Sequence, residues 1–201
     1  ATSLFLYYGK PGLAASEAAA ADVWQDYLAV WHLPNGADAA SPSRSLTASG
    51  TVTSSTNGLG AGAAVLNGNG VLSIAETDWL QGHAALSVQL RSKADNLGHD
   101  RGQLGAGADL FATGDGDLIV RYQSVGYGDS QPQNLLHSTI ATTAGKVRVS
   151  SGADTQSTNW QSISLAWQSG DPLSQLYLDG APAEPSFTMP ISGAATTQIG
   201  G

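Results

Sequence analysis

The segment from Trp160 to Pro182, WQSISLAWQSGDPLSQLYLDGAP, constrains the fold most strongly, because it contains two strand patterns and two turn signals. In its first half, Ile163, Leu165 and Trp167 alternate with polar residues. This is the period of a β-strand that buries one face. The following SGDPLS contains Gly and Pro, which end such a run.

The second half of the segment repeats the pattern. Leu176 and Leu178 alternate with their neighbours, and Asp179-Gly180 follows directly. Gly at this place tolerates the positive φ that tight hairpin turns often require. The sequence therefore predicts an antiparallel hairpin.

The remainder of the chain has the same character of short strands separated by turns. No long helical period and no internal repeat of 20 to 50 residues is visible in the sequence. Further strands are predicted at Leu4–Tyr8, Ala29–Leu33, Leu46–Val52, Ala63–Glu76 (two strands about a turn at Asn67–Gly70), Leu86–Leu90, Gln103–Leu104, Asp109–Tyr122 (a hairpin), Leu135–Ala141 and Lys146–Ser150. About a dozen short strands predict an all-β protein built as a two-sheet antiparallel β-sandwich.

Composition limits the classes of partner. The 201 residues are enough for one all-β domain, and the absence of Cys excludes disulfides, thiolate metal sites and a cysteine nucleophile. A net charge of −8 argues against nucleic acid and against an anionic membrane surface. No apolar run approaches the roughly 20 residues of a membrane span, so no direct membrane insertion is expected. The low charged fraction of 12%, with abundant Gly, Ala, Ser and Thr, is typical of secreted or surface bacterial modules.

Several segments, taken in order, resemble a known family. They are VWHL, GAGAAVLNGNGVLSI, ALSVQLR, LIVRY, WQSISLAWQSG and LYLDG. Together they resemble the laminin-G-like members of the concanavalin A-like lectin and glucanase superfamily, over about Ala29 to Gly201. The most specific pieces are Trp160, Trp167 and LYLDG in combination, and the LNG strand at Leu66–Gly68. The resemblance implies a jelly roll whose ligands are met on the concave sheet or at the loop rim.

The N-terminal part resembles something different. LFLYYGKPGLAASE followed by VWQDYLAVWHL is similar to the end of a bacterial extracytoplasmic domain of unknown function that commonly precedes such modules. This resemblance implies an N-terminal strand and linker at residues 1–22, a sandwich at residues 23–201 and flanking domains in the same polypeptide. It also implies an extracytoplasmic location: secreted, at the cell surface or periplasmic. The family continues past QIGG into a last strand, so either that strand lies beyond Gly201 or the N-terminal LFLYYG strand takes an edge role there.

Catalysis is not expected. Glycosidases of this superfamily carry Glu-x-Asp-x-x-Glu, whose two carboxylates serve as nucleophile and acid/base. Here Glu76 and Asp78 are followed by Gln81, which cannot exchange a proton, and the motif lies in a connection between strands. No Gly-x-Ser-x-Gly elbow accompanies the four His residues. An active glycoside hydrolase is the remote alternative.

Calcium is a candidate cofactor, because hard oxygen ligands on a rim loop would suit it. Asp115 and Asp117, in TGDGDL, are the candidate metal ligands. Asp129 is a further candidate, and Asp38 and Asp109 are weaker ones. The alternative is that GDGD is only a hairpin turn made of turn-favouring residues.

Glycan binding requires an exposed aromatic ring beside convergent polar groups, since sugars offer apolar ring faces and a rim of hydroxyls. The loop from Val125 to Asn134 contains both kinds of residue, and loops are where binding residues concentrate. The predicted ligand-binding residues are Tyr127, Asp129, Gln131 and Asn134, with Trp79 as a second aromatic platform. Trp31, Trp160 and Trp167 fall on strand patterns and are predicted to be core.

The sequence thus favours a noncatalytic recognition module of a larger bacterial surface or periplasmic protein, whose partner is a glycan or a surface protein. The alternative is a structural or assembly module without a small ligand, joined to its neighbours through an open sheet edge.

Overall fold

A computed structural model gives the structure of the chain. It describes residues 23–33, 35–58, 62–75, 78–94, 107–113, 118–125, 133–142, 145–151, 155–170, 174–183 and 185–189. The chain divides into two compact units, Ala1–Trp79 and Leu80–Gly201. The boundary that the sequence predicts after residue 22 lies at the start of the described residues and stays a prediction.

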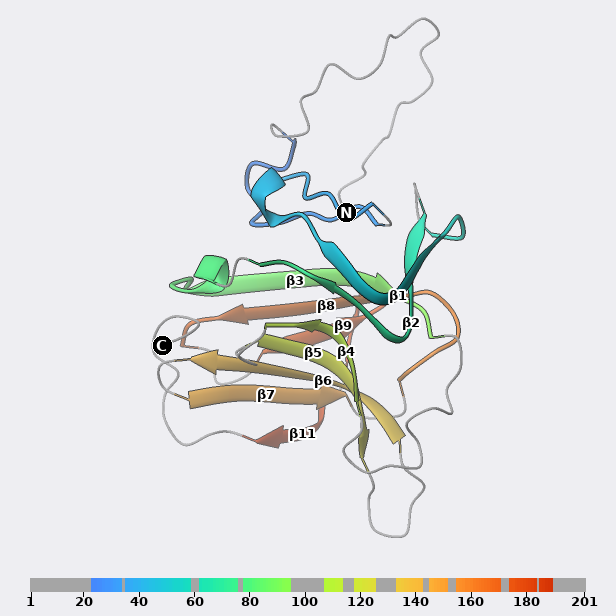
Figure 1. Cartoon of the computed structure of the whole chain (residues 1–201). Coiled ribbons are helices and arrows are strands. Elements are labelled where there is room, and N and C mark those ends of the chain that lie inside the picture. Colours follow the sequence, from blue (N-terminus) through green and yellow to red (C-terminus); the bar gives the residue numbers. More distant parts are fainter. Residues whose placement is uncertain are drawn as a thin grey trace, which may run out of the picture. The chain divides into compact units, whose positions relative to one another are not determined.

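The second unit contains two antiparallel sheets (Figure 1). The four-stranded sheet has the order β10 (Ala181–Pro182), β9 (Gln175–Leu178), β8 (Gln161–Gln168) and β3 (Ala85–Ser92). The five-stranded sheet has the order β11 (Pro185–Met189), β7 (Gly145–Ser151), β6 (Gln133–Thr142), β5 (Leu118–Val125) and β4 (Gly107–Ala112). In the five-stranded sheet, β4 to β7 follow one another as a meander, and β11 adds to the β7 edge. The predicted all-β class is confirmed, and two antiparallel sheets in one unit are consistent with the predicted sandwich.

The hairpin that the sequence predicts most clearly is confirmed. In β8, the alternate residues Ile163, Leu165 and Trp167 are buried, and the polar residues between them are more exposed. β3 pairs with β8 in unbroken register and places Leu86 opposite Trp167. The alternating pattern therefore supplies one apolar face of the sheet, as the strand period requires.

The turn between β9 and β10 has the predicted conformation. Asp179 and Gly180 have φ of 52° and 82°, so both are left-handed, as in the tight turns that match strand twist. The carboxylate of Asp179 also accepts a hydrogen bond from the backbone N–H of Ser162 at 2.8 Å. The turn is thereby tied to the neighbouring strand β8.

The five-stranded sheet packs a second apolar face against the first. Its fully buried side chains Leu118, Val120, Leu136 and Ile140 come from alternate positions of β5 and β6. On the same face, the hydroxyl of Tyr122 donates a hydrogen bond of 2.8 Å to Oε1 of Gln161 in β8. This bond joins the two sheets across the core.

Tyr122 is buried among these groups, and the burial shifts the pKa of its hydroxyl upward. The pKa of Tyr122 is raised to about 12, mainly by burial and to a smaller extent by the charge of Asp179, while a hydrogen bond with the Ser92 side chain acts in the opposite direction. The other end of the Gln161 amide is also bonded, because its Nε2 donates a hydrogen bond to the carbonyl of Thr155 at 2.8 Å. Both polar groups of this buried pair are therefore satisfied, as buried polar groups must be.

The first unit contains the antiparallel pair β1 (Thr47–Ser55) and β2 (Ala63–Ser73). The prediction of two strands about a turn at Asn67–Gly70 is wrong, because β2 is one strand with an irregularity at this point. Gly50 and Asn69 approach so closely there that a Cβ on Gly50 would clash with the carbonyl of Asn69. Glycine thus serves a bulge here and not a turn.

The strand predicted at Ala29–Leu33 is also not found. Only Trp31 forms a single bridge, to Asp38, before the 3-10 helix η1 (Pro42–Arg44). Asp38 is buried, and one of its carboxylate oxygens accepts from the backbone N–H groups of Val30 and Ala40, each at 2.9 Å. The side chain of Asp38 takes the place of a strand partner, a local alternative that Asp offers to the backbone.

In the part of the chain described here, no helix has both the length and the apolar character needed to cross a membrane.

Candidate functional site

Most of the predicted binding residues cannot be compared with the structure. Asp115, Asp117, Tyr127, Asp129 and Gln131 lie outside the described residues. Asn134 lies in β6, where its backbone pairs with Ser124, but the position of its side chain is not described. The glycan and calcium roles of these residues therefore stay predictions.

The two weaker calcium candidates each face an arginine. Oδ2 of Asp38 lies 3.4 Å from Nε of Arg44, and Oδ1 of Asp109 lies 2.6 Å from a terminal guanidinium nitrogen of Arg121. In each case the positive guanidinium already neutralises the carboxylate charge that would otherwise attract a calcium ion. Among the described residues, no group of three or more His, Cys, Asp or Glu is arranged to hold a metal ion.

Trp79, the second predicted platform, is packed within the first unit. Its ring meets that of Trp31 edge-on, with centroids 6.0 Å apart and planes at 82°. The Arg44 guanidinium carbon lies 5.6 Å from the Trp79 ring centroid, a cation–π distance. Nε1 of Trp31 donates to the carbonyl of Arg44 at 2.7 Å, which fixes this group further. Trp79 is therefore engaged by its own neighbours, and a platform role is not supported.

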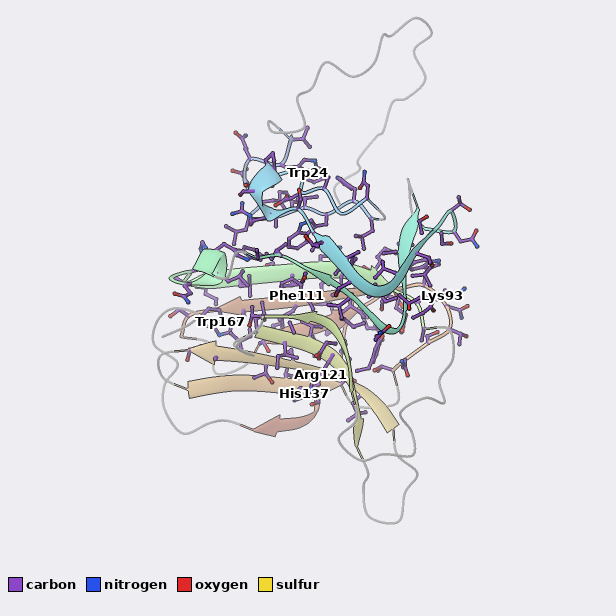
Figure 2. All side chains as sticks on the ribbon, in the orientation of Figure 1. Trp24, Lys93, Phe111, Arg121, His137 and Trp167 are labelled. Carbon is purple, nitrogen blue, oxygen red and sulfur yellow. The ribbon has the colours of Figure 1, made fainter. Side chains whose placement is uncertain are left out.

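A different set of polar residues crosses the five-stranded sheet. Asp109 of β4 is the register partner of Arg121 of β5, Arg121 is the partner of His137 of β6, and His137 is the partner of Ser150 of β7. Figure 2 labels Arg121 and His137 on their neighbouring strands. Cross-strand partners lie about 5 Å apart. We call these four residues the polar row.

The polar row lies on the face of the sheet that points away from the sandwich core. Tyr122 and Ser138 point into the core, where they bond Gln161 and Ser174 respectively. Successive residues of a strand point to opposite faces. Arg121 and His137 directly precede these two residues, and therefore point outward.

Hydrogen bonds join the residues of the row into two groups, Asp109 with Arg121 and His137 with Ser150. Nε and a terminal nitrogen of Arg121 both lie 2.6 Å from Oδ1 of Asp109. Nδ1 of His137 lies 2.7 Å from the hydroxyl of Ser150, and Nε2 lies 3.1 Å from the hydroxyl of Thr139. A hydroxyl can donate or accept, so both imidazole nitrogens are matched in the neutral ring.

The row is open at one end only. The side chain of Asp109 is 47% exposed and that of Arg121 is 28% exposed, whereas His137 is half-buried and Ser150 and Thr139 are buried. Access is therefore from the β4 end. At that end a carboxylate, which only accepts hydrogen bonds, stands beside a guanidinium, which only donates them.

Such an arrangement can bind, and among the described residues no carboxylate of the row bonds His137 as a nucleophilic triad would require. Ser150 and His137 form a hydrogen-bonded pair, but the carboxylate of the row is engaged by Arg121 and the second His137 nitrogen meets Thr139. A triad needs a group that orients the base. What the row offers instead is fixed donors and acceptors at the strand spacing.

This row is not among the sequence predictions, although two residues inside apolar strands pointed to it. Arg121 and His137 each interrupt an apolar strand, in LIVRY and in NLLHSTI. Charged or imidazole groups inside such runs must face outward or find partners. Only the strand register places the two residues next to each other, and register cannot be read from either segment alone.

No family model, no curated protein and no solved structure matches this chain.

Proposed function

We propose that the protein is a noncatalytic recognition module that binds a glycan through the open end of the polar row. The observation that carries the proposal is the register of Asp109, Arg121 and His137 across three adjacent strands. Sugar hydroxyls both donate and accept, so neighbouring acceptor and donor groups fit adjacent hydroxyls of one sugar. Charge-assisted hydrogen bonds of this kind are the stronger ones.

The rigid support of the row favours binding. Arg121 and Asp109 lie on paired strands of a sheet whose opposite face is fully buried core. Side chains held on strands keep their geometry better than side chains on loops. Less conformational entropy is then lost when the ligand binds.

The proposal has further parts, which concern the identity, the location and the metal of this module. They are a jelly-roll, laminin-G-like identity, an extracytoplasmic location within a larger bacterial surface or periplasmic protein, and a calcium ion at Asp115 and Asp117. A surface protein as ligand is the second ligand class. The absence of catalysis is supported by Gln81 in place of the final carboxylate and by Asp78, which begins the 3-10 helix η2 (Asp78–Leu80) instead of lying on a strand.

A thermal-shift screen with neutral mono- and oligosaccharides, with and without calcium, tests the proposal. A ligand that binds only the native state raises the melting temperature. We expect at least one sugar to raise it for the native chain, and this shift to be lost in Arg121→Ala. The matched control is Arg91→Ala, because Arg91 is an exposed arginine on a strand of the other sheet.

Two results would overturn the glycan proposal: no sugar shifts the melting temperature, or the shift survives in Arg121→Ala. A rise with calcium alone would support the metal site at Asp115 and Asp117 without the glycan site. Activity on β-glucans that Glu76→Gln abolishes would instead establish the glycosidase alternative.

An assembly role is the second candidate, and the β1–β2 pair favours it. Leu66 and Val71 of β2 are 49% and 50% exposed, and their register partners Val52 and Ser49 place them on opposite faces of the pair. An isolated two-stranded sheet is only marginally stable in water. Sedimentation at rising protein concentration tests this role: a self-association that Leu66→Ser weakens supports it, and a monomer at every concentration opposes it.

A further inference from the structure

Three aromatic side chains of the first unit contact one another, and none of them belongs to the polar row. Trp24 and Tyr27 meet edge to face, with ring centroids 5.3 Å apart and planes at 83°. The His32 ring lies 5.5 Å from Trp24 at a tilt of 56°. We call these three residues the aromatic corner.

The backbone fixes the first two rings relative to each other. The N–H of Tyr27 donates to the carbonyl of Trp24 at 2.9 Å, which closes a turn. Edge-to-face contact is a favourable geometry for two aromatic rings. The corner is thus held by a turn as well as by ring contact.

Two members of the corner are exposed, whereas neither ring of the other aromatic pair of the same unit is. Tyr27 is 57% exposed and His32 is also exposed, while Trp24, Trp31 and Trp79 are half-buried, and Arg44 contacts the last two. The two pairs have nearly equal interplanar angles, 83° and 82°. Ring packing alone therefore does not account for the exposure of Tyr27, which has Val23 exposed near it in the sequence.

We propose that the aromatic corner is a sugar-stacking site, on which Tyr27 receives the apolar face of a pyranose ring. Tyr and Trp present an apolar body with a polar tip, which suits ligands that are apolar on one face and polar at the rim. Gln25, Asp26 and His32 are exposed nearby in the sequence and bring hydrogen-bonding groups for the sugar hydroxyls. The proposal rests on the glycan function proposed above and adds a second site for the same class of ligand.

The openness of the corner decides between two ligand classes. A cation over an aromatic ring gains much more when the ring encloses and desolvates it than when it is exposed. Tyr27 is more than half exposed, so a cation cage is disfavoured. A flat ligand that covers the ring removes apolar surface from water without needing enclosure.

Fluorine NMR of the full chain with 5-fluorotryptophan tests the site. The Trp24 signal, assigned by Trp24→Phe, is followed during titration with the oligosaccharide that gives the largest thermal shift, or with cellohexaose and xylohexaose if none does. We expect the Trp24 signal to move at millimolar sugar, while that of the core residue Trp167 stays in place. Open stacking sites on a single ring give weak affinity, so an apparent Kd in the millimolar range is expected.

Three variants separate stacking from a general apolar effect. Tyr27→Leu removes the ring and is expected to raise the Kd at least fivefold, whereas Tyr27→Phe keeps the ring and should leave Kd within twofold. Val23→Ala is the matched control, because Val23 is an equally exposed apolar neighbour at 53%.

The outcomes distinguish this site from the polar row. If Arg121→Ala leaves the Trp24 response intact and Tyr27→Leu removes it, the corner is an independent site. Sugar binding that Arg121→Ala abolishes and that never moves the Trp24 signal overturns the corner and leaves the polar row. A Trp24 signal that responds to tetramethylammonium but to no sugar overturns the stacking site in favour of a cation site.

Discussion

The two faces of the five-stranded sheet use neighbouring residues of the same strands for different purposes. On the inner face, Tyr122 and Ile140 are buried among apolar side chains of both sheets. On the outer face, Arg121 and His137 belong to a row of polar groups that ends in solvent. A single strand can therefore stabilise the core with every second side chain and still offer a binding surface with the side chains between them. Changes on the inner face should therefore affect stability, and changes on the outer face should affect binding.

The largest expected effect comes from the inner face. Ile140→Ala removes a fully buried side chain from β6 and leaves a cavity, so the free energy of unfolding should fall by about 2 to 5 kcal/mol. Urea denaturation measures the loss. Arg121→Ala, on the outer face of the neighbouring strand β5 and 28% exposed, is the control; an equal loss there would contradict the division of roles between the two faces.

Alkaline pH should weaken the same face through Tyr122. Its pKa is about 12 in the folded protein and 10.0 in the unfolded chain, so the phenol is neutral in both states below pH 10. Between pH 10 and 12 the unfolded chain loses this proton first, and stability falls with rising pH by roughly 2 to 3 kcal/mol. Urea denaturation at pH 9, 10, 11 and 12 measures the fall. In Tyr122→Phe the fall over this range should be clearly smaller.

Tyr122→Phe at neutral pH tests the bond between the two sheets. It removes the hydroxyl that donates to Gln161 and leaves a buried amide oxygen without its partner. We expect a loss of about 1 to 3 kcal/mol in the free energy of unfolding. Tyr122→Phe combined with Gln161→Leu should recover part of it, since no buried amide oxygen is then left unpaired; the recovery is only partial because the carbonyl of Thr155 loses the Nε2 donor of Gln161. A double variant as unstable as the sum of both single variants would show that the hydrogen bond is not what joins the sheets.

The smallest effect on stability is expected on the outer face. The ion pair of Asp109 and Arg121 is partly exposed, and such pairs contribute about 0.2 to 1 kcal/mol. A double-mutant cycle of Asp109→Ala and Arg121→Ala measures the coupling in the free energy of unfolding. The same variants should abolish the sugar-induced shift in melting temperature. A coupling above about 2 kcal/mol would mean that the pair stabilises the fold and is not a free recognition surface.

The structure confirms the sequence predictions where a strand buries one face. The alternation of Ile163, Leu165 and Trp167 predicted β8 and its buried side, and Asp179-Gly180 predicted the left-handed turn. These features are local, because alternation and turn conformation depend on a few adjacent residues. Trp167 is buried as predicted, while Trp31 and Trp160 are only partly buried.

Predictions failed where side chains or glycines replaced the expected backbone pairing. The segment Ala29–Leu33 alternates like a strand, yet the carboxylate of Asp38 takes the backbone N–H of Val30. Asn67–Gly70 has the composition of a turn, yet it forms an irregularity within β2. In the first case a side chain eight residues away, and in the second the close approach of Gly50 to Asn69 on the paired strand, decided between two locally acceptable conformations.

The sequence by itself determined that this protein is all-β, and it determined which residues of β3 and β8 face the core. The period of a strand is two, so the choice of buried side chains is already present in the order of residues. Only the tertiary structure decided that Asp109, Arg121, His137 and Ser150 form one row, because cross-strand neighbours depend on the register of four separate segments. It also leaves Tyr27 exposed beside Trp24, whereas Trp31 and Trp79 both contact Arg44.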